Sequence, residues 1–292
     1  MALFEDKYWW SNDGLRLHYR DYPADAENAD RPMLLCLPGL TRNARDFANF
    51  ADRYAGEWRV VCLELRGRAE SAYAKDSMTY VPLTYAQDIE RLLTDLAPQR
   101  FVAIGTSLGG ILTMLMAPTH TNRLAGALLN DIGPDIEEAG LDRIRGYVGA
   151  GGSHPTWVHA ARALAESSGD IYPDYKLEDW LAMAKRLHRL NSNGRISLDY
   201  DMRIADPLKV PGNEAGFDMW PVLAAFRDIP TLIVRGALSD LMSEKTAKRM
   251  MKDIGASAEL VTVPRVGHAP TLDEPEAVAG IDRLLERVLA RG

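Results

Sequence analysis

A serine flanked by glycines is the first feature of the chain that could carry chemistry. Residues 105–109 read Gly-Thr-Ser-Leu-Gly, between an apolar stretch typical of a buried strand and an apolar helical stretch. A residue on so sharp a turn has a strained backbone, and side chains two positions to either side would collide. Glycine removes these collisions, and the helix that follows directs free N–H groups at the site. The pattern predicts that Ser107 is a nucleophile.

A serine hydroxyl needs a base to become an effective nucleophile. The chain has six histidines, and His268 lies in a loop just beyond a strand predicted at 258–263. Sites in parallel α/β sheets form at the carboxyl ends of the strands, so this loop is expected on the same edge as Ser107. We therefore predict that His268 is the general base.

The third member of such a triad is a carboxylate at the same edge, and the sequence offers two. Asp240 follows a strand predicted at 230–234 and gives the chain order Ser, Asp, His, which is one known order for this triad. Asp131 directly follows a strand predicted at 124–130 and is the rival. We predict that Asp240 holds His268 in orientation and that Asp131 is a structural cap or turn residue.

Attack on a carbonyl also requires hydrogen-bond donors for the developing oxyanion. One predicted donor is the backbone N–H of Leu108, directly after the nucleophile. The other is the N–H of Leu40, in the turn after the first buried strand, where Gly39 permits close approach and Pro38 has no N–H. Arg42, just beyond this turn, is a candidate for binding a substrate carboxylate.

Apolar strand patterns alternate with helical patterns, which predicts an α/β fold with a mostly parallel, doubly wound sheet. A hairpin with its turn at 12–14 precedes them. A T-x-x-Q capping box at Thr84 and Gln87 predicts a helix over 85–96. The predicted buried strands lie at 32–37, 58–65, 101–106, 124–130, 230–234 and 258–263.

The alternation stops near residue 133 and resumes near residue 230. Helical patterns at 137–147, 155–167 and 177–190 fall between, so we predict a helical lid inserted after the sixth strand. The predicted division is a core of residues 1–133 and 212–292 with a lid of residues 134–211. Tyr147 and Trp157 are candidate substrate-binding residues in this lid, which is expected to form a mostly apolar enclosure.

Composition excludes several classes of function. The formal net charge of −7 argues against nucleic acid or an anionic membrane as the main partner. Two cysteines exclude a disulfide framework. The first residues lack the features of a signal peptide, and no window is long and apolar enough for a membrane span, so a cytoplasmic location is expected. No metal-binding or nucleotide-binding motif is present, and we expect no cofactor.

The chain resembles the α/β-hydrolase superfamily over nearly its whole length. It is most similar to the lid-bearing group of enol-lactonases, carboxylesterases and carbon–carbon bond hydrolases. Two positions depart from the common pattern: Pro38 stands where many members have histidine, and Ala69 stands where glycine is usual. The resemblance rests on Pro38-Gly39, Leu65-Arg66-Gly67 with Ser71, residues 105–110, Ser239-Asp240 and Gly267-His268.

The resemblance implies a hydrolase that cleaves a small carboxylic ester or lactone through an acyl-enzyme. Dehalogenases and epoxide hydrolases of this fold use an aspartate nucleophile, and Ser107 argues against both. One alternative is a carbon–carbon bond hydrolase of ring-cleavage diketones with the same triad. Another is a slow-turnover ligand-binding receptor of the same fold.

Overall fold

An eight-stranded sheet runs through the computed structural model, which describes residues 3–210 and 218–291. The strand order is β1-β2-β4-β3-β5-β6-β10-β11. Only the pairs β1–β2 and β2–β4 are antiparallel among these neighbours, and the others are parallel. The strands are β1 Glu5–Trp10, β2 Arg16–Tyr22, β3 Met33–Leu37, β4 Val60–Glu64, β5 Phe101–Thr106, β6 Leu124–Asn130, β10 Thr231–Gly236 and β11 Ala258–Val263.

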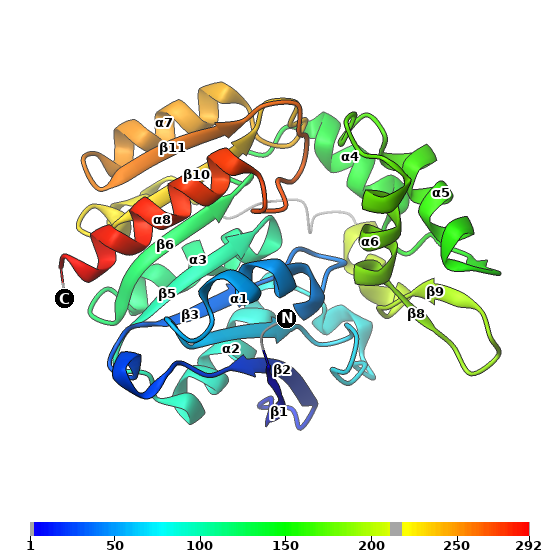
Figure 1. Ribbon diagram of the computed structural model, residues 1–292, viewed down its shortest axis with the longest axis horizontal. Coiled ribbons are helices and arrows are strands. Elements are labelled where there is room, and N and C mark those ends of the chain that lie inside the picture. Colours follow the sequence, from blue (N-terminus) through cyan, green and yellow to red (C-terminus); the bar gives the residue numbers. More distant parts are fainter. Residues whose placement is uncertain (1–2, 211–217, 292) are drawn as a thin grey trace.

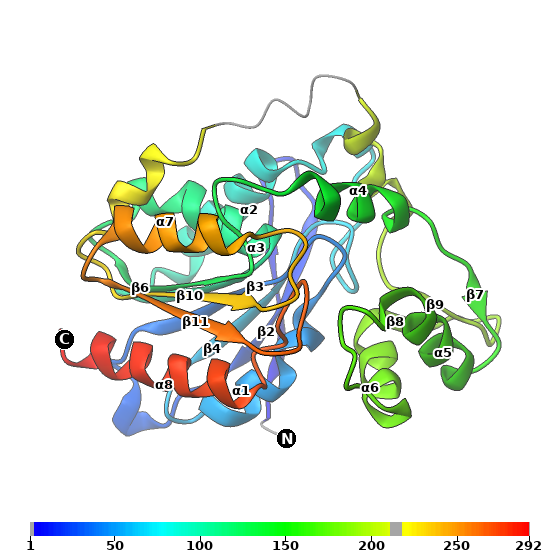
Figure 2. The same ribbon diagram turned by 90° about the horizontal axis from the view of Figure 1, so that it is seen from above.

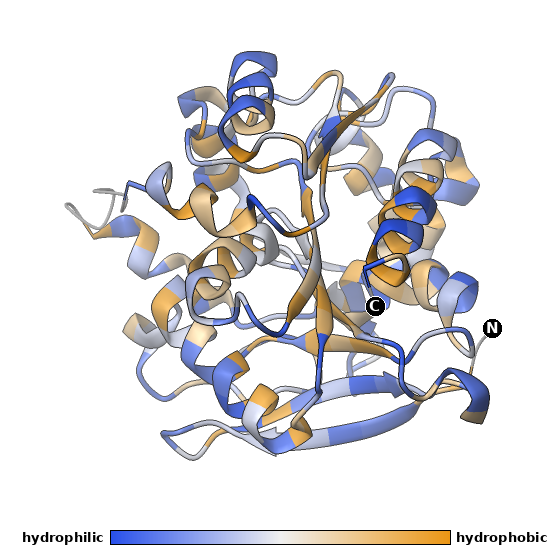
Figure 3. Cartoon of the chain, turned by 90° about the vertical axis from the view of Figure 1, so that its left-hand side faces the viewer, coloured by the Kyte–Doolittle hydropathy of each residue, from blue (hydrophilic) through white to orange (hydrophobic). Residues whose placement is uncertain are grey.

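Helices cover both faces of this sheet (Figures 1 and 2). Two of them, α1 (Ala48–Tyr54) and α8 (Pro275–Leu289), lie on one face. The other face carries α2 (Pro82–Leu96), α3 (Leu108–Met116) and α7 (Glu244–Ile254). Figure 3 shows the apolar strands between the two helical layers, as expected of strands buried on both faces. In the described part of the chain, no helix is both long and apolar enough to cross a bilayer.

Helix α2 begins earlier than the sequence pattern predicts. The capping box at Thr84 and Gln87 predicts a start at 85, but the helix begins at Pro82, and its N-cap, Val81, makes no side-chain cap hydrogen bond. Proline fits the first helical position because its fixed φ suits the helix and it has no N–H to satisfy. The preset backbone of Pro82 therefore takes the place of the predicted side-chain cap.

We call residues 134–210, which lie between β6 and the described residues that lead to β10, the cap segment. It contains α4 (Glu138–Tyr147), α5 (Trp157–Ser168) and α6 (Leu177–Leu187). It also contains a small sheet that the sequence did not predict, in the order β7-β9-β8. The third helix ends at Leu187 instead of 190 because β8 (His188–Leu190) pairs with β9 (Ile196–Leu198), which in turn pairs with β7 (Ser153–His154). The boundary predicted at 211 lies outside the described residues.

Hydrogen bonds fix the cap segment at the carboxyl edge of the large sheet. The backbone N–H of Gly267, next to His268, donates to the carbonyl of Ile171 at 2.7 Å. From the core, Arg45 Nε donates to the carbonyl of Arg186 at 3.0 Å. The position of the cap segment is therefore set by contacts on two sides of the sheet edge.

Substitutions at two glycines, one in α3 and one in α4, test how tightly the sheet and α3 pack. A Cβ on Gly109 would lie 1.9 Å from the carbonyl oxygen of Leu37, whereas a Cβ on Gly146 in α4 meets nothing within 4 Å. Gly109→Ala is expected to lower the free energy of unfolding by more than about 3 kcal/mol. Gly146→Ala is expected to raise it by about 0.5 kcal/mol, because alanine favours the helix. Thermal unfolding of both variants checks this, and similar melting temperatures would contradict it.

Candidate active site

Ser107 occupies the sharp turn between β5 and α3. Its backbone has φ +52° and ψ −114°, a conformation that non-glycine residues rarely adopt. A Cβ on Gly105 would lie 2.4 Å from the carbonyl oxygen of Gly109, and Gly109 itself lies directly against β3. The predicted reason for the two glycines is confirmed, because the turn closes only without side chains at these positions.

His268 links Ser107 to a carboxylate, but the carboxylate is Asp131. His268 Nε2 lies 2.9 Å from Ser107 Oγ, and His268 Nδ1 lies 2.8 Å from Asp131 Oδ2. The side chains of His268 and Asp131 are 8% and 0% exposed. An ionised carboxylate only accepts hydrogen bonds, so Nδ1 carries the proton and Nε2 accepts from the serine hydroxyl.

The prediction that Asp240 is the partner of His268 is wrong. Asp240 instead accepts hydrogen bonds from Arg143 Nε and Nη2 of α4, at 2.5 and 2.7 Å. These bonds hold the pKa of Asp240 below its ordinary value. Asp131 follows β6 directly, next to β5, the strand that leads into Ser107, and its left-handed backbone (φ +54°) belongs to the turn there. The rival aspartate therefore holds the position that was assigned to Asp240.

Ser239 is a member of the site that the sequence analysis did not assign. Its hydroxyl donates to Asp131 Oδ2 at 2.6 Å and accepts from the N–H groups of Leu241 and Met242. The backbone N–H of Gly236 donates to Asp131 Oδ1 at 2.9 Å. The end of β10 and the loop after it thus contribute donors that orient the aspartate instead of contributing the aspartate itself. The available signal was the polar Ser-Asp pair in the loop after β10.

The two predicted oxyanion donors flank the nucleophile. Leu108 follows Ser107, and the turn that carries Leu40 abuts it, since a Cβ on Gly39 would lie 3.7 Å from Ser107 Cβ. Among the hydrogen bonds of residues 3–210 and 218–291, none is donated by the N–H of Leu40 or Leu108. The buried Arg68, which the sequence analysis did not assign, donates from Nε and Nη2 to the Leu40 carbonyl at 2.9 and 2.7 Å. Arg68 therefore holds this turn in place.

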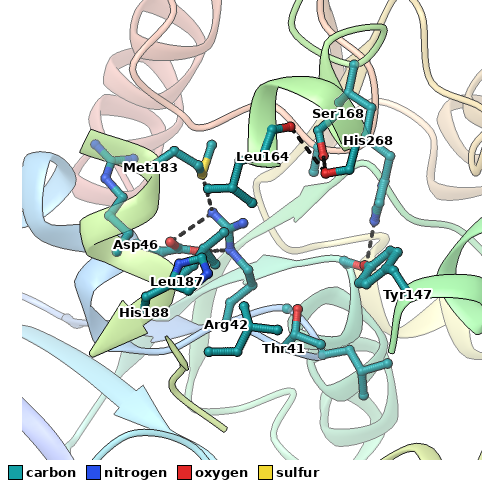
Figure 4. A pocket seen from close by; sticks show the side chains of 18 of the residues that line it. Thr41, Arg42, Asp46, Tyr147, Leu164, Ser168, Met183, Leu187, His188 and His268 are labelled. Carbon is teal, nitrogen blue, oxygen red and sulfur yellow. Dashed lines mark hydrogen bonds and ion pairs between the residues drawn. The ribbon is translucent and has the colours of Figure 1, made fainter. Parts of the chain in front are cut away.

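A cavity of about 500 Å³ opens above Ser107 and His268, and the cap segment forms part of its wall. Arg42 and Tyr147 line it, as Figure 4 shows. Trp157 does not line it, contrary to the prediction, because its ring packs against the apolar cluster between the cap segment and the core. The apolar part of the wall comes mainly from α5 and α6, through Ala160, Ala163, Leu164, Trp180, Met183 and Leu187.

The wall is mostly apolar, as predicted from the sequence, but it also carries charged side chains. The arginines Arg42, Arg143 and Arg186 line the cavity together with Asp46. In the part of the chain that the structure describes, no group of three or more His, Cys, Asp or Glu side chains is arranged to hold a metal ion.

Known proteins share this fold and much of this sequence. A family model described as "Alpha/beta hydrolase family" matches residues 34–281. The chain belongs to the alpha/beta hydrolase family. A crystal structure of an alpha/beta hydrolase from Novosphingobium aromaticivorans is similar to this hydrolase with a TM-score of 0.93 and 57% identity, covering 98% of this chain and 99% of that one. The predicted fold is thereby confirmed.

Two curated relatives are hydrolases that match over most of their length. The 3-hydroxybutyrate-oligomer hydrolase of Cupriavidus necator is 31% identical over 272 residues, covering 90% of this alpha/beta hydrolase and 91% of the relative. The 2-(acetamidomethylene)succinate hydrolase of Mesorhizobium japonicum is 24% identical over 252 residues, covering 86% of each chain. The family and these relatives make this alpha/beta hydrolase an enzyme with hydrolase activity.

The contact between His268 and Asp131 has a direct spectroscopic signature. A histidine Nδ1–H that donates to a carboxylate gives a downfield proton resonance in NMR spectra. Asp131→Asn is expected to shift or abolish this resonance, because the amide replaces an acceptor oxygen of the carboxylate. Asp240→Asn is expected to leave it unchanged, since Asp240 pairs with Arg143. If Asp240→Asn changed the resonance and Asp131→Asn did not, Asp240 would be the partner of His268.

Proposed function

We propose that the chain is a serine hydrolase that cleaves a small carboxylic ester or lactone through an acyl-enzyme. The observation that carries this proposal is the continuous chain of hydrogen bonds from Ser107 through His268 to Asp131, at 2.9 and 2.8 Å. Three groups in this order form the arrangement that activates a serine in unrelated hydrolases. Asp131 takes the role that was first assigned to Asp240.

In the proposed mechanism, Ser107 Oγ attacks the ester carbonyl while His268 Nε2 takes its proton. Asp131 keeps the ring in the required tautomer and stabilises the imidazolium that forms. The N–H groups of Leu40 and Leu108 donate to the oxyanion of the tetrahedral intermediate. His268 then protonates the leaving alcohol. A water molecule, activated by the same histidine, releases the acid and restores the serine.

The size of the cavity and the names of the relatives support a small substrate. About 500 Å³ falls within the range of pockets that enclose small molecules. The name of the Cupriavidus relative describes hydrolysis of oligomers of 3-hydroxybutyrate, in which ester bonds join short hydroxy acids. We propose short esters of this kind as the substrate class of this chain. The cap segment, as a lid, would exclude water and bulky lipids from the serine.

Replacing the nucleophile tests the reaction itself. Ser107→Ala is expected to lower kcat for p-nitrophenyl acetate by about 10³-fold or more, because the covalent step is lost. Ser77→Ala, in a short 3-10 turn (Ser77–Thr79) away from the cavity, is the matched control and should keep the parent rate. Ester hydrolysis by Ser107→Ala at the parent rate would refute the mechanism. Activity on a ring-cleavage diketone with none on esters would favour the carbon–carbon bond hydrolase.

The two aspartates provide a paired test of the acid. Asp131→Asn is expected to lower kcat for p-nitrophenyl acetate by about 10⁴-fold, since an amide favours the wrong tautomer of His268. Asp240→Asn is expected to change this rate by less than about tenfold, because its partner is Arg143. Steady-state kinetics on both variants measures the two losses of kcat. Equal losses would show that Asp131 has no special role.

A further inference from the structure

Guanidinium groups dominate the charge on the wall of the cavity. Arg42, Arg143 and Arg186 line it, but Asp46 is the one acidic residue among the lining residues of the described chain. Neither Asp240, which pairs with Arg143, nor Asp273, which lies 3.4 Å from Arg186, is among these lining residues. The side chains that face a ligand therefore carry a net positive charge, with three arginines against one aspartate.

Arg42 and Arg143 are held in the same way. Arg42 uses Nε and Nη2 to donate to the carboxylate of Asp46. Arg143 uses Nε and Nη2 to donate to the carboxylate of Asp240. Each guanidinium is planar and rigid, so a carboxylate on one edge fixes the direction of the remaining N–H groups.

The Nη1 group of each arginine remains available. In the described residues, neither Arg42 Nη1 nor Arg143 Nη1 is the donor of a hydrogen bond to protein. Neither atom is among the fully enclosed polar atoms that lack a partner. Both residues line the cavity, so a ligand there has access to donors that are already oriented.

The two guanidinium groups act on the same region beside the catalytic residues. Burial raises the pKa of Tyr147, and the nearby charges of Arg143 and Arg42 oppose that rise. Both arginines are also electrostatic neighbours of Tyr172, whose hydroxyl donates to the carbonyl of Ala269 next to His268. Figure 4 shows Arg42 in the cavity beside Asp46 and Met183, with Tyr147 and His268 on the other side.

We propose that Arg42 and Arg143 form a subsite for a free carboxylate of the substrate, so that the enzyme acts on anionic esters such as oligomers of a hydroxy acid. This inference rests on the proposed serine hydrolase. Hydrogen bonds between guanidinium and carboxylate groups are among the strongest in proteins. A neutral ester would offer the two Nη1 groups no charged acceptor, and a site built to bind an acceptor discriminates strongly against a ligand that lacks it.

The sharpest test masks the carboxylate of one substrate. The dimer of 3-hydroxybutyrate as the free acid is compared with the same dimer as its dimethylamide, because both contain the same ester bond. The parent enzyme is expected to have a kcat/KM at least about tenfold higher for the acid. Arg143→Gln is expected to lower kcat/KM for the acid by about tenfold or more and for the amide by less than threefold.

Three further variants make the result specific. Arg42→Gln combined with Asp46→Asn removes the other guanidinium without leaving its carboxylate unpaired. Arg143→Gln combined with Asp240→Asn does the same at α4. Both double variants should lose the preference for the acid. Arg283→Gln is the matched control, because its ion pair with Glu259 lies on the surface outside the cavity, and it should keep that preference.

A binding measurement gives a second readout that needs no turnover of the dimer. 3-Hydroxybutyrate is expected to inhibit hydrolysis of p-nitrophenyl acetate competitively, with an inhibition constant about tenfold higher in Arg143→Gln. Equal rates on acid and amide, with equal inhibition of parent and variant, would overturn the subsite. The serine mechanism would survive that result, since it fails only if Ser107→Ala keeps the parent rate.

Discussion

The approach of Gly109 to the carbonyl of Leu37 is the constraint on which the rest of the site depends. With a Cβ at position 109 only 1.9 Å from that oxygen, the start of α3 could not lie against β3. This packing bends the chain so sharply after β5 that Ser107 takes a positive φ. The strain is maintained by the buried sheet and helix around it. The serine hydroxyl consequently meets His268 at the edge where β6 and β10 also end.

The carboxyl edge of the sheet explains both what the sequence predicts well and what it predicts wrongly. Ser107 and His268 follow from local patterns, a glycine-flanked turn and a loop after a strand. The choice between Asp131 and Asp240 depends on where two loops lie in space. Asp131 follows its strand without an intervening residue, whereas the loop before Asp240 is long enough to turn that side chain toward α4. The spacing of residues in the sequence does not indicate which way the Asp240 side chain points.

The cap segment shows a second limit of sequence patterns. Its three helices have apolar faces with helical spacing and were predicted within a few residues. Strands β7, β8 and β9 contain only two or three residues each, which is too short for an alternating pattern to be recognised. The position of Trp157 outside the cavity depends on how α5 packs on its neighbours. Sequence patterns likewise did not indicate a role for Arg68, because this residue holds the carbonyl of a distant residue, Leu40.

The hydrogen bonds that join the cap segment to the core end on main-chain atoms at several points. Arg45 and Asn43 donate to the carbonyl of Arg186, and Gly267 donates through its own N–H to the carbonyl of Ile171. A side-chain substitution at 171 or 186 leaves that carbonyl in the chain. This part of the attachment of the cap segment is therefore independent of the identity of the side chains that face the ligand, unlike the ion pair between Arg143 and Asp240. Substitutions of side chains that line the cavity can therefore change the substrate preference while these main-chain contacts keep the cap segment attached.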